Sequence, residues 1–221
     1  MSVLNLLSVR EQVYEYLKSM INSGELKSGD TINLNALADK FNISKTPLRD
    51  ALLQLEVDGF VNILPRKGII VSKLTLEDIK WYYEVIASAE SYILEKYGNK
   101  MTGDHLDAME KYNNSMKDAL KNDNFDEYYK NNLNFHNTYI NLTENKTMLK
   151  TIRVAKERLY DFPRKKEFVK DWELDSVVEH DELINLLEQK EFALAAKFIK
   201  NVHWSFEYQL KYILKYYTET E

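Results

Sequence analysis

The sequence contains no cysteine, and only three prolines and six glycines among its 221 residues. Without cysteine the chain has no disulfide framework, no thiolate metal site and no thiol catalysis. The scarcity of proline and glycine favours a mostly helical chain with few turns. No apolar run is long enough to span a membrane, and the N-terminus lacks the charged-then-apolar pattern of a signal peptide, so we expect a cytoplasmic protein with no membrane partner.

The chain also has no excess of positive charge, since its net charge is −5. Taken globally, this value argues against binding to nucleic acid, but the charge is unevenly distributed. Residues 1–74 carry nine basic and eight acidic side chains, a net of +1, and residues 75–221 carry 21 and 27, a net of −6. This asymmetry fits a binding head followed by an acidic body, and the length is sufficient for two modest domains.

The sequence Ser-Lys-Thr-Pro-Leu-Arg, which begins at Ser44, is typical of a turn that leads into a helix. Ser44 and Thr46 are both suitable N-caps, and Pro47 is tolerated in the first turn because its missing N–H is not needed there. An inward stripe at helical spacing follows, formed by Leu48, Ala51, Leu52 and Leu55. Lys45, Thr46 and Arg49 project from the other side, as in a recognition helix that enters a major groove.

The segments on either side of this helix support the same interpretation. An amphipathic helix is predicted over residues 9–22, and Asn33 or Asn35 is placed to cap a second helix that ends near Phe41. Two helices joined by a short turn, the second starting with Ser-Lys-Thr, make a helix-turn-helix. Residues 60–64 and 68–72 are rich in β-branched residues and predict a hairpin, or wing, with Arg66 and Lys67 at its tip.

From Thr75 onward the pattern is fully helical, which predicts a helical bundle. Helices are expected over residues 75–97, 104–120, 124–142, 146–160, 175–187 and 192–217. The predicted fold is therefore mainly α, with a winged helix-turn-helix in residues 1–74 and an all-helical domain in residues 75–221.

The chain has only four histidines, His105, His136, His180 and His203. Imidazole is the commonest protein metal ligand, so their placement bears on function. Asn132 and His136 lie four residues apart on one predicted helix and share a face, while His180 and His203 lie on two later helices. Such side chains can meet inside a bundle, but composition and spacing alone do not distinguish a metal site from hydrogen-bonded structural histidines.

Five segments of the first 74 residues share their order and spacing with a known family. They are Gly24–Asp30, Leu37–Ala38, Ser44–Leu52, Leu55–Val61 and Arg66–Val71. Together they resemble the winged-helix head of GntR-family bacterial transcription regulators. The resemblance implies that operator DNA is held by the serine-to-arginine segment and the wing tip, which comprise Ser44, Lys45, Thr46, Arg49, Arg66, Lys67 and Gly68.

Lys45 is a departure from the pattern, since family members usually have arginine at this position. Lysine keeps the charge for a phosphate contact but lacks the planar fork that grips a guanine edge with two hydrogen bonds. The resemblance therefore implies an altered base preference at this position.

The second half resembles the FCD-type effector domain of the FadR subfamily of these regulators, through Asn132–His136, Glu179–His180 with Leu183–Ile184, and His203. Many members bind a divalent cation through an aspartate and three histidines, which implies Asn132, His136, His180 and His203 as ligands here. Asn132 replaces the aspartate, and its uncharged amide oxygen weakens the site for hard cations. Neutral imidazoles with one carbonyl oxygen suit zinc or nickel. His105 matches no motif and is expected at the surface.

Family members also commonly place an arginine four residues before a glutamate in the first helix of this domain, where it pairs with an effector carboxylate. Glu90 corresponds to that glutamate, but the position four before it is Ile86. The usual anchor for a carboxylic acid effector is therefore absent. Arg153, Arg158 or Arg164 are the candidates to replace it, although ordinary surface roles are open for each.

We therefore expect a DNA-binding transcription regulator, a repressor whose operator affinity is controlled by a small-molecule effector. A head of this kind works as a homodimer on a palindromic operator. Dimerisation also fits the many aromatic residues of the second domain, which exceed what one small bundle readily buries. The alternative is a metal-dependent enzyme that uses the three histidines. It lacks a His-Glu-x-x-His or other hydrolytic motif and leaves the basic head without a role.

Overall fold

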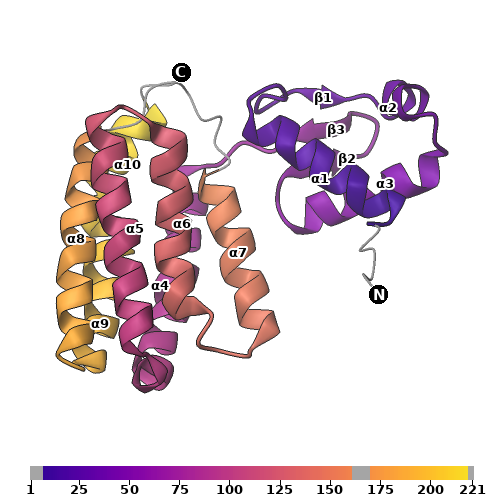
Figure 1. Ribbon diagram of the computed structural model, residues 1–221. Coiled ribbons are helices and arrows are strands. Elements are labelled where there is room, and N and C mark those ends of the chain that lie inside the picture. Colours follow the sequence, from indigo (N-terminus) through magenta and orange to yellow (C-terminus); the bar gives the residue numbers. More distant parts are fainter. Residues whose placement is uncertain (1–6, 161–169, 219–221) are drawn as a thin grey trace. The chain divides into compact units, whose positions relative to one another are not determined.

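The computed structural model describes residues 7–160 and 170–218, which form two compact units (Figure 1). The first extends to Thr75 and also takes in the last turn of α7 from Glu157; the second begins at Leu76. None of the helices in the described part of the chain has the length and hydrophobicity needed to cross a membrane.

The first unit contains three helices, α1 (Val9–Asn22), α2 (Leu34–Phe41) and α3 (Lys45–Val57). The side chain of Asn33 accepts hydrogen bonds from two amides of the first turn of α2, so that of the two expected caps Asn33 is the one used. The predicted stripes meet in one apolar core. It contains Val13, Leu17, Ile21, Ala38, Leu48, Ala51, Leu52, Leu55 and Phe60 among others. The burial of these stripes holds α1 and α2 against α3.

A three-stranded antiparallel sheet completes this unit, in the order β1 (Thr31–Ile32), β3 (Gly68–Val71), β2 (Val61–Leu64). β2 and β3 are the predicted hairpin, paired from Val61 opposite Val71 to Leu64 opposite Gly68. β1 was not predicted from the sequence. It has only two residues, too few to show an alternating pattern, and it exists because β3 offers it a free edge.

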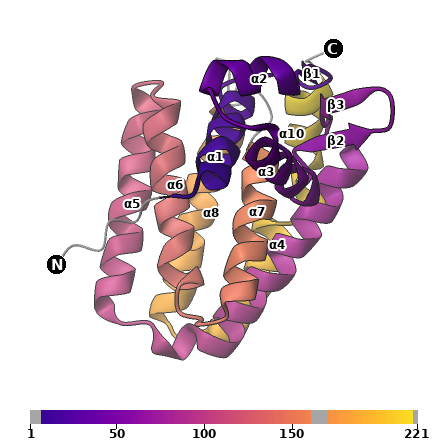
Figure 2. The ribbon, with the colours of Figure 1, turned by 90° about the vertical axis from the view of Figure 1, so that its right-hand side faces the viewer.

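The described residues of the second unit form helices and the turns that join them. This unit contains α4 (Leu76–Tyr97), η1 (Gly98–Lys100), α5 (Gly103–Lys121), α6 (Phe125–Ile140), α7 (Lys146–Tyr160), α8 (Lys170–Glu188), α9 (Phe192–Phe198), η2 (Ile199–His203) and α10 (Phe206–Thr218). Figure 2 shows α4, α5, α6, α7 and α8 as long rods that run up and down beside one another. The predicted fold class, a winged helix-turn-helix followed by a helical bundle, is confirmed.

The expectation of one continuous last helix over residues 192–217 is wrong. The chain widens into the π-helical turn η2 and breaks at Trp204 before α10 begins. The Trp204 N–H donates to the Ile199 carbonyl, five residues back, over 2.8 Å. No glycine or proline marks this break in the sequence, and the side chain of Trp204 at its end makes the interior contacts described below.

Candidate functional site

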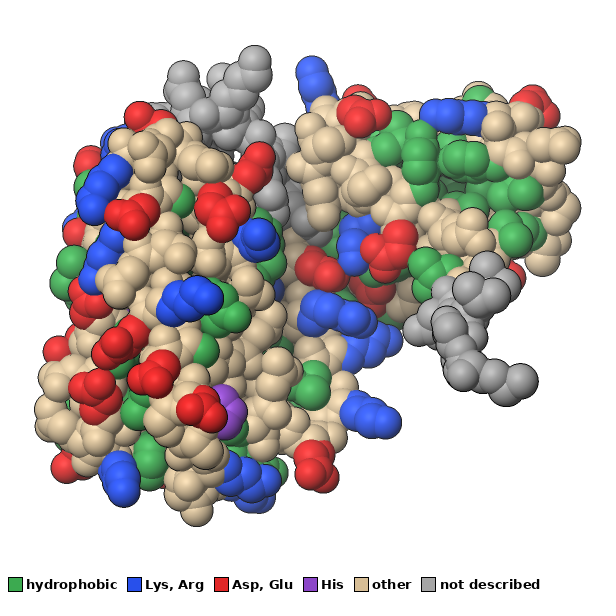
Figure 3. All heavy atoms as spheres, in the orientation of Figure 1, with side chains coloured by type: hydrophobic (Ala, Val, Ile, Leu, Met, Phe, Trp, Pro, Cys, Tyr) green, Lys and Arg blue, Asp and Glu red, His purple; other side chains and the backbone are tan. Residues whose placement is uncertain are grey.

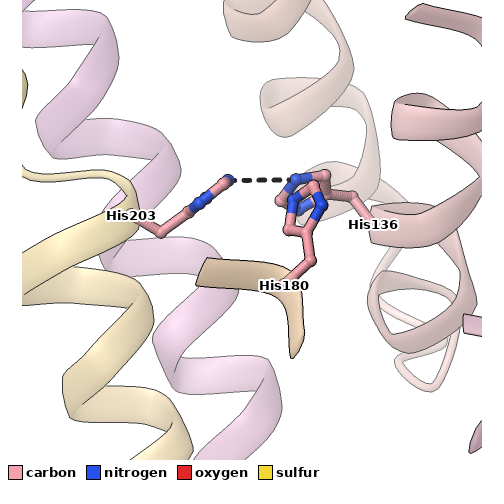
Figure 4. A group of neighbouring side chains, drawn as sticks. All are labelled: His136, His180 and His203. Atoms are coloured by element: carbon pink, nitrogen blue, oxygen red, sulfur yellow. Dashed lines mark hydrogen bonds between the residues drawn. The ribbon is translucent and has the colours of Figure 1, made fainter. Parts of the chain in front are cut away.

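Three of the four histidines converge inside the helical unit. His136 lies on α6, His180 on α8 and His203 at the end of η2, and one ring nitrogen from each lies within 4.8 Å of the others. Figure 4 shows the three imidazoles approaching from separate stretches of ribbon. The Nε2 atoms of His136 and His203 are 3.2 Å apart. His136 and His180 are 1% and 0% exposed, and His203 is half-buried.

Each imidazole has a second contact at its Nδ1 atom, on the side away from the cluster. Nδ1 of His203 lies 2.8 Å from a carboxylate oxygen of Glu179, and Nδ1 of His136 lies 3.1 Å from Glu90. Nδ1 of His180 lies 3.2 Å from the side-chain oxygen of Asn113. Because ionised carboxylates only accept hydrogen bonds, Nδ1 of His203 donates to Glu179. Nδ1 of His136 also lies 2.7 Å from the Tyr139 hydroxyl, which gives its own hydrogen to Glu90, so this Nδ1 donates as well and both Nε2 atoms carry lone pairs.

Glu90 organises the region behind His136. Its carboxylate accepts hydrogen bonds from the hydroxyl of Tyr139 and the indole N–H of Trp204, the latter over 2.9 Å. The Lys156 ammonium lies 2.6 Å from the other carboxylate oxygen, and both side chains of this ion pair are buried. Burial alone would raise the pKa of Glu90, but Lys156 and His136 outweigh it and lower the pKa below its usual value. Trp204, which makes this bond, stands directly after η2, where the helix breaks.

Burial keeps two of the three rings, His136 and His180, neutral. Burial, reinforced by the Lys156 ammonium, lowers the pKa of His136 to about 3. Burial also lowers the pKa of His180, with further contributions from the two neighbouring histidines. Among the described residues, none forms a hydrogen bond with Nε2 of His180, although this atom is buried. Neutral imidazoles with free lone pairs are the state that ligates metals.

The arrangement fits a divalent transition metal. In a tetrahedral site with Zn–N distances of about 2.0–2.1 Å, two nitrogens lie about 3.3 Å apart, close to the separation of the His136 and His203 Nε2 atoms. Two Nε2 lone pairs at this distance repel each other unless a proton or a cation lies between them. Metal-binding histidines also typically donate their other N–H to a carboxylate or carbonyl oxygen, as here.

The remaining residues of the predicted site are distributed as follows. Asn132 is buried on α6, four residues before His136. His105 is outside the cluster and belongs to the start of α5, where its Nδ1 accepts from the Thr102 N–H over 3.0 Å. Arg153 is exposed on α7, Arg158 is buried, and Arg164 lies outside the described residues.

Sequence reasoning missed the residues that support the histidines. Asn113, Lys156, Tyr139 and Trp204 match no motif, and Glu90 and Glu179 were named only within the family resemblance, without a role as histidine partners. A lysine in a helical sequence suggests a solvated face, so nothing in the pattern marks Lys156 as a partner in the interior. Only the packing of α4, α5, α6, α7 and α8 brings these residues together.

The residues predicted to face DNA are all at the surface of the first unit. Ser44, Lys45, Thr46 and Arg49 are exposed at the start of α3, and Arg66, Lys67 and Gly68 are exposed at the turn between β2 and β3. Ser44 occupies the N-cap position, but its side chain makes no capping hydrogen bond. Pro47 explains this, because it is the third helical residue and lacks the amide that an N-cap side chain commonly binds.

Charge on the helical unit is mixed. On the face that Figure 3 presents, basic and acidic side chains alternate over the helical unit, which includes α5, without a large basic patch. Exposed ion pairs such as Lys117–Asp181 and Lys121–Asp118 lie on α5 or between α5 and α8. This surface does not have the electrostatic character of a nucleic-acid interface.

Two family models match the chain. The first is described as "Bacterial regulatory proteins, gntR family" and covers residues 9–71, and the second is the FCD domain, covering residues 82–202. The chain belongs to the GntR family. GntR regulators bind operator DNA, and this protein is a transcription regulator of that family and not a metal-dependent enzyme.

Curated relatives agree with this assignment. The chain is 28% identical over 181 residues to the HTH-type transcriptional regulator YdhC of Bacillus subtilis, covering 81% of this GntR chain and 80% of the relative. It is 27% identical over 199 residues to the gluconate operon transcriptional repressor of Bacillus licheniformis, covering 86% and 79% of the two chains.

Solved structures share the fold. A GntR transcriptional regulator from Rhodococcus sp. RHA1 superposes with a TM-score of 0.70 at 14% identity, covering 97% of this chain and 100% of the other. McbR/YncC of E. coli gives a TM-score of 0.69 at 20% identity, covering 98% and 100%.

Proposed function

We propose that this GntR regulator is a repressor that binds a palindromic operator as a homodimer and is controlled by a small-molecule effector. Residues 1–74 are the DNA-binding domain in this proposal, and residues 75–221 are the effector-binding and dimerisation domain. The observation that carries it is the family match over residues 9–71, combined with an exposed polar and basic start of α3 beside a basic wing. Repression is supported by the similarity to the gluconate operon repressor.

In the proposed complex, α3 enters the major groove with its N-terminus first. The amides of the first turn of a helix lack partners within the helix and favour a phosphate, and the Ser44 hydroxyl, which makes no capping bond, is free to bind one as well. Lys45, Thr46 and Arg49 supply groove contacts, and Arg49 is the residue able to grip a guanine edge with two hydrogen bonds. Arg66, Lys67 and the Gly68 backbone contact phosphates or the minor groove.

Selection from a pool of random-sequence duplexes tests this proposal. We expect enrichment of an inverted repeat whose half-sites are about one helical turn apart. Arg49→Ala should lower affinity for the selected duplex and relax specificity at one base pair, with a cost of about 1–3 kcal/mol. Lys121→Ala, which removes an exposed basic side chain from α5, is the control. Loss of binding in the control alone, or no enrichment by the wild type, would overturn the proposal.

We also propose that His136, His180 and His203 hold a divalent metal, zinc or nickel, together with the amide oxygen of Asn132. The converging neutral imidazoles, with their outer hydrogen-bond acceptors, support this. When bound, the metal would supply a Lewis-acidic centre for an effector carboxylate. It would take over the role of the arginine that family members commonly have at the position of Ile86. Arg153 and Arg158, which both lie on α7, remain proposed effector contacts.

Metal content of the purified protein, before and after loading with zinc or nickel, is the direct test. We expect about one equivalent per chain in the wild type and none in His136→Ala. His105→Ala is the matched control, because His105 lies outside the cluster. A wild-type protein that stays metal-free after loading would mean that Asn132 has disabled the site, and uncharged ligands would then be the effectors to screen.

A further inference from the structure

Asn113, on α5, has a buried side-chain amide, and its neighbours determine which amide atom donates and which accepts each hydrogen bond. It is 1% exposed. Its amide nitrogen donates to the Val177 carbonyl over 2.9 Å and to an Asp181 carboxylate oxygen over 2.7 Å. Both partners only accept hydrogen bonds. A flipped amide would place its oxygen against the Val177 carbonyl and the Asp181 carboxylate, so only one orientation of the amide is possible.

The orientation of this amide decides which nitrogen of His180 carries the proton. With both N–H groups of Asn113 engaged, only its oxygen is left to face Nδ1 of His180, at 3.2 Å. An amide oxygen accepts and cannot donate, so the Nδ1 atom must carry the hydrogen. Nε2 of His180 then holds the lone pair, and among the described residues it has no hydrogen-bond partner. It faces His136 and His203.

His180 differs in this respect from the other two members of the cluster. His136 and His203 each have a carboxylate at Nδ1, from Glu90 and Glu179, and a carboxylate accepts whichever way it is turned. A neutral amide presents an acceptor on one side and donors on the other. The tautomer of His180 therefore depends on what holds the amide, which is the Val177 carbonyl together with Asp181.

Asp181 is in turn held from the surface. Both of its carboxylate oxygens lie 2.7 Å from the Lys117 ammonium, and Lys117 is one turn after Asn113 on the same helix. A chain of contacts thus runs from an exposed ion pair to a fully buried imidazole. The ion pair with Lys117 holds Asp181 in place to accept from Asn113.

We propose that Asn113 is a positioning residue that fixes His180 in the tautomer whose Nε2 is ready to bind a metal, and that Asp181 orients Asn113. The inference deepens the metal-binding function proposed above and rests on it for its biological role. The hydrogen-bond geometry that carries it is present in the protein without a metal, so part of its test is independent of metal binding.

The first experiment is a two-bond ¹H–¹⁵N NMR spectrum of the metal-free protein labelled at its four histidines, assigned by single replacements. We expect His180 with its hydrogen on Nδ1. In Asn113→Leu the acceptor is gone, and we expect the hydrogen of His180 to move to Nε2. Asn131→Leu, which removes a buried asparagine of α6 that donates to Glu127, should preserve the wild-type tautomer. A wild-type His180 with its hydrogen on Nε2 overturns the proposal, whatever the variants do.

The second experiment is zinc titration in competition with a chromophoric chelator. Loss of an outer hydrogen-bond partner typically weakens metal binding about 10- to 100-fold, and we expect a loss of this size in Asn113→Leu. Asp181→Ala, a change at an exposed residue that leaves the core intact, should give a smaller loss in the same direction. Asn131→Leu is the matched control: it removes another buried asparagine, on α6, whose amide donates to Glu127 and forms no hydrogen bond with a histidine among the described residues.

Failure of the proposed role of Asn113 can be distinguished from failure of the proposed metal binding. A wild type that binds neither zinc nor nickel overturns metal binding, while the NMR spectrum still decides the role of Asn113. A wild type that binds zinc, with Asn113→Leu and Asn131→Leu weakened equally, overturns the positioning role of Asn113 and leaves the metal site intact.

Discussion

Glu90 and Lys156 form an ion pair with almost no contact with water, their side chains being 0% and 6% exposed. The cost of removing two charges from water is offset here by hydrogen bonds from Tyr139 and Trp204 to the same carboxylate. Lys156 also lies 5.2 Å from the centre of the Trp204 ring, a cation–π distance. At the scale of single residues, this pair holds α7 and the segment after η2 to the back of the histidine cluster.

Replacing one partner of this pair is expected to destabilise the protein strongly. Lys156→Met leaves the Glu90 carboxylate buried without its counter-charge, and we expect a loss of about 3–5 kcal/mol in the free energy of unfolding. Urea denaturation at pH 7, followed by far-UV circular dichroism in the presence of a chelator, measures it. The control is Lys121→Met, which removes an exposed pair with Asp118 and should cost less than about 1 kcal/mol. Equal losses in both variants would contradict the account of the buried pair.

At the scale of elements, the close approach of α9 to the end of α4 positions η2 and hence His203. Gly98, which follows α4, is buried against Phe192 at the start of α9. A Cβ atom built at Gly98 would lie 2.5 Å from a ring carbon of Phe192 and 3.2 Å from its Cβ atom. The two helices therefore pack this closely only with glycine at this position.

Gly98→Ala is accordingly expected to push α9 away from α4 or to force Phe192 out of its rotamer. Overpacking of this kind costs about 1–3 kcal/mol, and thermal unfolding followed by circular dichroism should show a lowered midpoint. Gly103→Ala is the matched control, because a Cβ there meets nothing within 4 Å and the residue opens α5. Its stability should be unchanged or slightly raised. A midpoint of Gly98→Ala at or above that of the wild type would contradict the close approach.

At the scale of the whole molecule, α4 carries an apolar surface that is exposed to solvent in a single copy of the chain. Trp81, Val85 and Tyr92 recur along one side of this helix and are 53%, 39% and 41% exposed. They line an open groove together with Ala89 and Met148. Exposed apolar surface of this extent typically marks an interface, and the proposed occupant is the same face of a second copy, as a two-fold dimer requires.

Trp81→Glu should therefore convert the dimer to a monomer. Two glutamates brought together across a two-fold axis repel each other and lose the apolar contact. Sedimentation equilibrium of the full-length chain measures the change, and we expect affinity for a palindromic duplex to fall with it. Val178→Glu, at a valine 65% exposed on α8, is the control and should leave the dimer intact. A wild type that sediments as a monomer at all concentrations would overturn the proposed dimer.

The proposed contribution of the wing to DNA binding belongs to the same scale and acts through charge. Lys67→Gln is expected to weaken binding about equally for all DNA sequences and to reduce the slope of log affinity against log salt by about 1 per half-site. Fluorescence anisotropy over a series of salt concentrations measures the slope. Lys121→Gln, on α5, is expected to leave it unchanged. An unchanged slope in Lys67→Gln would mean that the tip of the hairpin does not reach the DNA backbone.

The sequence alone was enough to predict the fold class and most helices, because burial of an apolar stripe is a local, periodic signal that α1 and α2 carry strongly. The Ser44–Arg49 segment and the wing were predictable as a DNA-binding pattern for the same reason, since their residues are close together in the chain. Only the tertiary structure shows the π turn before Trp204, strand β1 and the partners of the histidines. Glu90, Asn113, Lys156 and Glu179 come from four different helices, and the desolvation that pairs each with its partner exists only once those helices have packed.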